Sequence, residues 1–155
     1  MPLAIGDYHD TLWFATMAEL SECALFLGAK EEAAILRKAL APYSGMHCII
    51  GYGVASYGAV DRYLGQLSLV LEDWTEAITR LEAGIAQNES MQADAFVAHG
   101  QRELSLALLG RDAPGDRLRS ELLVRESSQT AERLGMTWLL SQLKSQMAPH
   151  GGLQA

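Results

Sequence analysis

Lysine, cysteine and proline are scarce in this 155-residue chain, and each scarcity narrows the kinds of protein that it can be. The three lysines stand against 19 acidic residues, and the net charge of -7 makes nucleic acid an unfavourable partner. Two cysteines, Cys23 and Cys48, are too few for a secreted disulfide scaffold, so a reduced, cytoplasmic setting is expected. Four prolines leave room for long uninterrupted helices.

Long apolar runs are also missing. No segment reaches the roughly 18 consecutive apolar residues of a membrane span, and "MPLAIGDYHD" lacks the basic and apolar regions of an export signal. The composition, 49% hydrophobic and 20% charged, is globular. We therefore expect one domain over residues 1–155, with an ordered core over about residues 8–148 and a flexible tail at 149–155.

Apolar residues recur at helical spacing through most of the chain. The first helix is expected between an N-cap at Asp10 and a stop at Gly28. A second helix is expected over about residues 30–41. Further helices are expected through 60–71 and 74–85, then over about 92–109, 115–134 and 136–147. The inward stripe of the first helix is predicted to be Trp13, Met17, Leu20, Ala24 and Leu27.

Small residues recur at a fixed interval in the first two helical pairs. Ser21 is followed twelve residues later by Ala33, and Gly65 is followed twelve residues later by Ala77. Small residues at such positions let two helix backbones approach closely. The spacing resembles the tetratricopeptide pattern, W-x2-L-G-x2-Y followed by A-x3-F, with the aromatic positions replaced. It predicts an all-α, tetratricopeptide-like stack of about three helical hairpins plus a C-terminal capping helix.

A more specific resemblance rests on four segments: "LAPYSG", "GYGVASYGAVDRYLGQLSLVLEDWTEA", "LGRDAPGDRLRSELL" and "AERLGM". They resemble the tetratricopeptide-like region of large bacterial LuxR-type regulators and ATPase-coupled adenylyl cyclases. That resemblance implies a signalling or transcription-regulating module that acts through protein contacts. The ATPase, cyclase and DNA-binding parts of those regulators are missing from this sequence, so their activities are not implied.

The glycine-rich segment "GYGVASYG", which spans residues 51–58, raises the question of a nucleotide site. It does not follow the G-x-G-x-x-G spacing, and no lysine with serine or threonine follows it as in a P-loop. We interpret the segment as a turn between helical pairs. "HCII", from His47 to Ile50, is the one place where a strand competes with helix.

The sequence predicts no catalytic residue, cofactor or metal site. The four histidines, His9, His47, His99 and His150, are dispersed, without the paired spacings of metal ligands. His99 beside Gly100 is expected to be a hydrogen-bonded core residue. The three tryptophans, Trp13, Trp74 and Trp138, are expected to pack in the core.

The predicted function is non-catalytic protein–protein interaction, without nucleic acid or membrane. In stacks of this kind the first helix of each pair lines a concave face, which assigns partner contacts to Glu22, Arg62, Gln66 and Gln101. An alternative is a small-molecule sensor with its ligand near the Gly51–Gly58 segment, beside Tyr52, Tyr57 and His47. Self-association through exposed ends of the stack is a third hypothesis.

Overall fold

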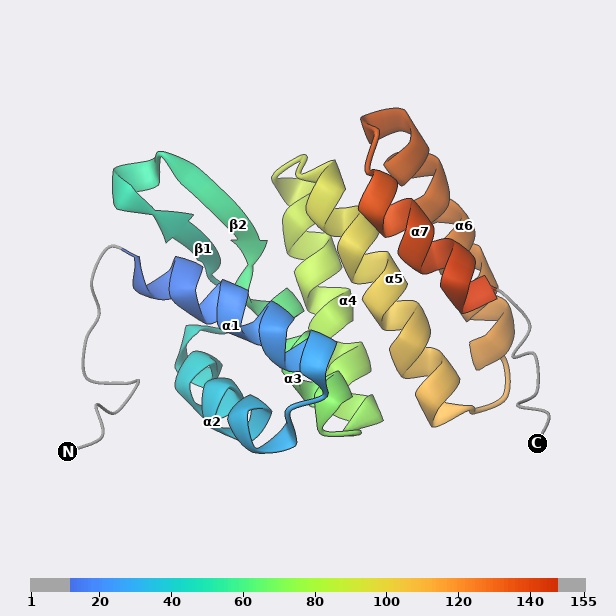
Figure 1. Ribbon diagram of the computed structural model, residues 1–155, viewed down its shortest axis with the longest axis horizontal. Coiled ribbons are helices and arrows are strands. Elements are labelled where there is room, and N and C mark those ends of the chain that lie inside the picture. Colours follow the sequence, from blue (N-terminus) through green and yellow to red (C-terminus); the bar gives the residue numbers. More distant parts are fainter. Residues whose placement is uncertain (1–11, 148–155) are drawn as a thin grey trace.

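The computed structural model describes residues 12–147, apart from the side chains of Tyr52 and Met147. The N-cap predicted at Asp10 and the flexible tail predicted for residues 149–155 lie outside this part of the chain. Seven α-helices form most of it, in agreement with the predicted helical order (Figure 1). They are α1 (Trp13–Leu27), α2 (Lys30–Leu40), α3 (Val60–Val70), α4 (Trp74–Ser90), α5 (Asp94–Arg111), α6 (Asp116–Leu134) and α7 (Thr137–Met147).

A β-hairpin between α2 and α3 corrects the expectation of an all-α chain. Strands β1 (His47–Ile50) and β2 (Ala55–Ala59) pair antiparallel, with Ile49 opposite Ser56 and a register irregularity between His47 and Ile49. The glycine-rich segment supplies the tip, a 3-10 turn over Gly51–Gly53, and most of β2. The predicted turn is therefore real, but it joins two strands that project beside α1 (Figure 1).

Gly58 fixes the end of this hairpin against the helices. Its φ of +84° is a conformation that residues with a side chain rarely adopt, and an added Cβ would lie 2.9 Å from Cγ of Phe96. The neighbouring Ala59 amide donates a hydrogen bond to Oδ1 of Asn88 at 2.9 Å. The close approach therefore ties β2, and the start of α3, to α4 and α5.

Several helix ends form where the sequence predicted them, although α4 continues to Ser90 instead of ending at 85. Gly28 and Gly135 take left-handed conformations directly after α1 and α6, which ends each helix. Asp73 caps α4, because its carboxylate accepts a hydrogen bond from the Glu76 amide.

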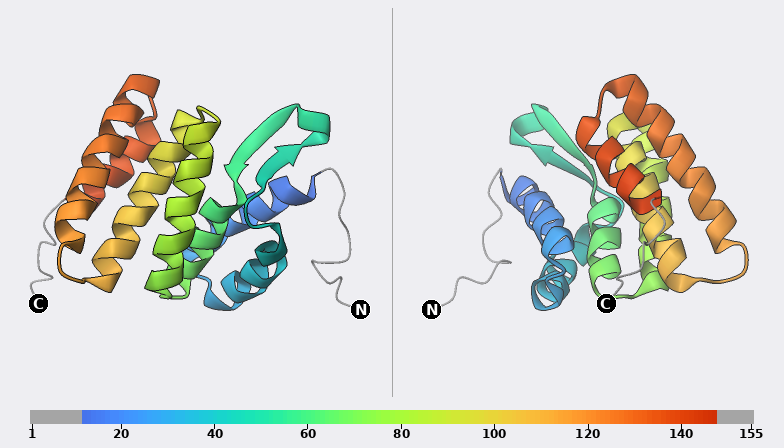
Figure 2. Two further views of the ribbon diagram at one scale, coloured as in Figure 1. Left: turned by 180° about the vertical axis from the view of Figure 1, so that it is seen from behind. Right: turned by 45° about the vertical axis from the view of Figure 1, so that its right-hand side comes forward.

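Consecutive helices pack side by side from one end of the molecule to the other (Figures 1 and 2). One hydrophobic cluster joins α1, α2 and α3, a second joins α3, α4 and α5, and a third joins α5, α6 and α7. In Figure 1, α1 and α7 lie on the face turned toward the viewer, to either side of α5. The helix α3 is central, and every one of its residues is buried.

The predicted close contact at Gly65 is present, and the sequence analysis missed a second one at Gly84. A Cβ on Gly65 would lie 2.5 Å from Cγ of Leu81, so the neighbour across this contact is Leu81 and not Ala77 as the motif suggested. A Cβ on Gly84 would lie 2.6 Å from the backbone nitrogen of Arg62. These two contacts let α3 and α4 pack at short distance.

Some predicted core positions are wrong. In α1, Trp13, Met17 and Ala24 are buried, but Leu20 is 39% and Leu27 is 73% exposed. Trp138 is 56% exposed, whereas Trp13 is buried as predicted. Helical spacing identifies a stripe but not its width, and α1 is apolar over more of its circumference than the core covers.

Candidate functional site

A cavity of about 760 Å³ opens between α1, α5 and α7. Figure 1 shows these three helices, with α1 and α7 on either side of α5. Helices that are far apart in the sequence therefore line the cavity. Its lining residues are Glu22, Cys23, Leu25, Phe26 and Leu27 from α1, His99, Arg102, Glu103 and Leu106 from α5, and Trp138 and Gln142 from α7.

A buried ion-pair network lies beside this cavity. Arg62 of α3 is 2% exposed, and its guanidinium donates from Nε to Oε2 of Glu103 at 3.0 Å and from a terminal nitrogen to Oε1 of Glu103 at 2.5 Å. The same terminal nitrogen donates to Oε1 of Glu22 at 2.7 Å. Gln66 adds a hydrogen bond from Nε2 to Oε1 of Glu103 at 2.8 Å. One arginine thereby joins α1, α3 and α5.

The network keeps Arg62 charged in spite of its burial. Burial alone lowers the pKa of a guanidinium, but the carboxylates of Glu103 and Glu22 outweigh it and raise the pKa of Arg62. Burial also opposes ionisation of Glu22, yet Arg62 and a hydrogen bond from Gln66 lower its pKa overall. The Glu22 side chain is 40% exposed, so it carries a negative charge at the rim of the cavity.

His99 is half-buried in the cavity wall and is uncharged at neutral pH. Burial, reinforced by the Arg62 charge, lowers the pKa of its imidazole to about 4. Its ring centroid lies 6.2 Å from that of Trp138. The predicted core histidine is thus part of the cavity lining.

Arg102 is the least well-paired charge of the site. A terminal nitrogen donates to Oε1 of Gln142 at 3.1 Å, while the enclosed Nε has no hydrogen-bond partner. Burial lowers the pKa of Arg102, and Glu103 and Glu22 oppose that effect. A guanidinium held through one neutral amide is available for a further acceptor.

Three large apolar side chains that line the cavity are exposed to solvent. Phe26 is 82% exposed, Leu27 is 73% exposed and Trp138 is 56% exposed. Phe26 and Leu27 end α1, and Trp138 begins α7 on the opposite wall. Large apolar side chains gathered around a concavity are typical of a binding site.

The structure brings together three of the four residues predicted to contact a partner. Glu22, Arg62 and Gln66 meet in the network beside the cavity, but Arg62 and Gln66 are buried within the chain at 2% and 0% exposure. Of the three, Glu22 reaches the surface. Gln101 lies apart, and its amide donates to Oε2 of Glu126 on α6 at 3.0 Å.

Glu103 and Arg102 were missed by sequence reasoning, although a signal for Glu103 was present. Glu103 occupies a motif position where the repeat pattern has an aromatic residue, as Asp61 does. A carboxylate at a position that is normally buried indicates a buried ion pair, because an unpaired charge there is costly. Arg102 has no such signal, since a single arginine on a helix is ordinary.

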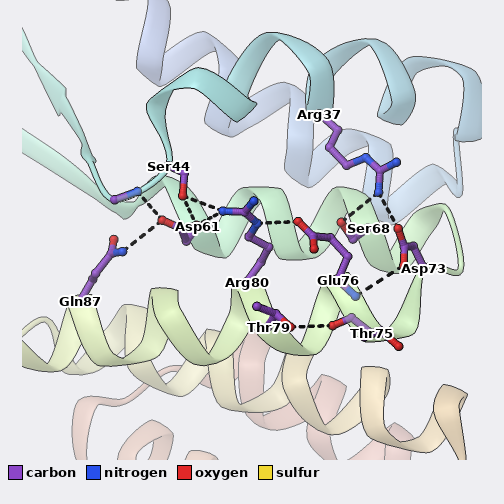
Figure 3. A network of polar contacts seen from close by, with 11 residues as sticks. Arg37, Ser44, Asp61, Ser68, Asp73, Thr75, Glu76, Thr79, Arg80 and Gln87 are labelled. Carbon is purple, nitrogen blue, oxygen red and sulfur yellow. Dashed lines mark hydrogen bonds and ion pairs between the residues drawn. The ribbon is translucent and has the colours of Figure 1, made fainter.

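Asp61 of α3 centres a second polar network, which includes residues of α4 and of the loop after α2 (Figure 3). Its carboxylate accepts hydrogen bonds from the Gly45 amide at 2.6 Å and from Ser44 Oγ at 2.9 Å. Gln87 and Arg80 of α4 donate to it at 3.1 and 3.0 Å. The network therefore joins the loop after α2 to α3 and α4.

The residues of the alternative ligand site do not line the cavity between α1, α5 and α7. The Tyr57 carbonyl accepts a 2.6 Å hydrogen bond from the Tyr63 hydroxyl, and His47 is half-buried in β1. The side chain of Tyr52 lies outside what the structure describes. Cys48 beside His47 is fully buried, and burial raises the pKa of its thiol to about 12, which disfavours the reactive thiolate.

Within residues 12–147, no group of three or more histidine, cysteine, aspartate or glutamate side chains is placed to hold a metal ion. No helix in that range combines the length and apolar character needed to cross a membrane.

Comparison of the chain with models of protein families, with curated proteins and with solved structures found no match.

Proposed function

We propose that this chain is a non-catalytic, tetratricopeptide-like interaction module of a bacterial signalling or transcriptional regulator, working in the cytoplasm. Its groove between α1 and α7 takes an apolar segment of a partner protein. The exposed apolar walls of the cavity carry the proposal, because Phe26, Leu27 and Trp138 face a concavity of about 760 Å³. Aromatic anchors around a concave surface commonly provide most of the binding energy at protein interfaces.

The buried network supports the same function in a different way. Arg62 fixes α1 to α3 and α5 through Glu22 and Glu103, so the groove has its shape before a partner arrives. A preformed groove loses less conformational entropy on binding than a mobile surface does. The Glu22 side chain is 40% exposed, which supports the partner contact proposed for it from the sequence.

Peptide display on the full chain tests the proposal. We expect selected peptides to be rich in apolar residues and to lose affinity by about tenfold or more in Phe26→Ser and Trp138→Ser, as expected for interface hot spots. Both side chains are exposed, so neither change removes core packing.

The matched control is Leu118→Ser, which alters a side chain on α6 that is 65% exposed. Affinity in this variant is expected to equal that of the wild type. If no selected peptide distinguishes the groove variants from the control, the groove is not the binding surface.

A small-molecule sensor at the Gly51–Gly58 segment has less support, because the cavity between α1, α5 and α7 is built from other residues. A thermal-shift screen against metabolites checks it. Saturating ligand at about 100 times its Kd stabilises a protein by about 2.7 kcal/mol, a shift such a screen detects.

A further inference from the structure

Arg102 lines the groove and is half-buried, and its charge is balanced differently from that of the buried Arg62 beside the groove. Arg62 has two carboxylates within hydrogen-bond distance, Glu22 at 2.7 Å and Glu103 at 2.5 Å. Arg102 is hydrogen-bonded to a neutral amide, that of Gln142, and its enclosed Nε lacks a partner. A buried donor without an acceptor is unfavourable, so an acceptor supplied by a ligand would be bound favourably.

The position of Arg102 along α5 defines where that acceptor lies in a bound segment. Arg102 lies in the cavity wall between His99, one turn before it, and Leu106, one turn after it. His99 is uncharged at neutral pH and lies beside Trp138. The arginine is therefore flanked on both sides by surfaces that suit apolar groups.

We propose that Arg102 is the specificity-determining residue of the groove, and that it binds the side-chain carboxylate of an aspartate or glutamate flanked by apolar residues in the partner segment. This inference rests on the proposed function. A guanidinium matches a carboxylate in geometry, and paired charged hydrogen bonds are roughly twice as strong as neutral ones. In the structure Nε is enclosed and a terminal nitrogen is hydrogen-bonded to Gln142, so binding of the carboxylate requires the Arg102 side chain to turn away from Gln142.

A side-chain carboxylate fits this position better than the carboxylate of a chain end. Apolar surface continues past Arg102 in both directions along α5, toward His99 and toward Leu106. A segment that ended at Arg102 would leave one of these surfaces uncovered. An internal acidic residue lets the segment cover both.

The test uses the peptides that wild-type chain selects from a display library, synthesised with blocked ends. We expect an acidic residue between apolar ones in the selected set. Replacing that residue with its amide counterpart should weaken binding to the wild type by about tenfold or more, the size expected when one partner of a buried charged contact is lost. This measurement requires no change to the protein.

The Arg102→Gln variant completes a double-mutant cycle. It should bind acidic and amide peptides with equal affinity, while Arg119→Gln, a change on α6 outside the groove, should keep the full preference. Arg102→Lys keeps the charge but not the forked geometry, so an intermediate preference is expected.

The outcomes separate this inference from the proposed function. Apolar peptides that depend on Trp138 but show no acidic preference would overturn the role of Arg102 alone. An acidic preference that survives in Arg102→Gln would overturn it as well. If no groove-dependent peptide is selected, or if small carboxylates bind while peptides do not, the proposed function and this inference both fail.

Discussion

At the scale of single residues, charges buried in the middle of the helical array distinguish this chain from a simple apolar stack. Arg62, Glu103 and Asp61 are each at most 2% exposed, yet each has ionic or hydrogen-bond partners within the chain. A buried ion pair adds little net stability compared with well-packed apolar residues. Removing one member of the pair destabilises the fold strongly, because the remaining charge is then buried without a partner.

Arg62→Met is therefore expected to destabilise the fold by about 3–5 kcal/mol. The double variant Arg62→Met with Glu103→Met should recover part of that loss, since it removes the orphaned carboxylate. Urea denaturation measures both. Arg133→Met is the control: Arg133 pairs with Asp94 through side chains that are 59% and 50% exposed, and a change within about 0.5 kcal/mol is expected. If Arg62→Met were as stable as Arg133→Met, the buried network would not be needed for the stability of the fold.

Asp61 gives a prediction about pH. Burial opposes its ionisation, but hydrogen bonds from Gly45, Gln87, Arg80 and Ser44 outweigh burial and lower its pKa in the folded state. The unfolded pKa is about 3.9. The stabilisation from Asp61 is thus complete above that value and is lost as the pH falls through the lower, folded pKa.

The Asp61→Asn variant is expected to be less stable than wild type by about 1–3 kcal/mol at pH 7, because an amide cannot accept the same set of charged hydrogen bonds. The difference should shrink as the pH falls below about 4. Urea denaturation of both proteins at neutral and acidic pH measures it. A difference that is constant over this range would show that the Asp61 charge does not stabilise the fold.

At the scale of elements, two glycines that lack a side chain set the spacing between α3 and α4. Gly65 meets Leu81, and Gly84 meets the backbone of Arg62. The second contact involves main-chain atoms, which cannot move aside as a flexible side chain can. The same contact places Arg62, and so its guanidinium, at a fixed depth in the molecule.

Gly84→Ala should therefore destabilise the fold by about 1–3 kcal/mol through overpacking. Helix propensity alone predicts the opposite sign, a gain of about 1 kcal/mol for alanine over glycine. Thermal or urea denaturation decides between the two effects. A stabilised variant would mean that α3 and α4 can separate at little cost.

The β-hairpin is the second feature at this scale. It accounts for the long segment between α2 and α3. The sequence marked "HCII" as a possible strand but gave no partner for it. Its partner, β2, contains Gly58, Tyr57 and Ser56, residues without the alternation of a half-buried strand. Gly58 fits between Phe96 and Asn88, a contact between segments far apart in the sequence that the residue pattern of β2 does not reveal.

At the scale of the whole molecule, the order of the helices puts α1, α5 and α7 around one cavity (Figure 1). The groove is a property of the assembled array, because no single hairpin contributes both walls. A second apolar cavity, of about 290 Å³, lies between α1 and α2 and is bordered by Leu20, Leu27 and Ile35. Self-association through such an exposed end remains a prediction, which light scattering over a range of concentrations checks.

The sequence by itself determined the helices and their ends. Periodic apolar residues, the stops at Gly28 and Gly135 and the small residue at Gly65 act locally, and local interactions can be seen in the order of residues. In α2 the buried residues Ala33, Leu36 and Leu40 lie three and four positions apart, the spacing of one helix face.

Only the tertiary structure decided the site. Glu22, Arg62 and Glu103 are about 40 residues apart from one another, or farther, and their pairing depends on how α1, α3 and α5 pack. The exposure of Trp138 depends on which side of α7 the array covers. Pairing and burial over such separations are set by the three-dimensional packing of helices, which periodicity along the chain does not specify.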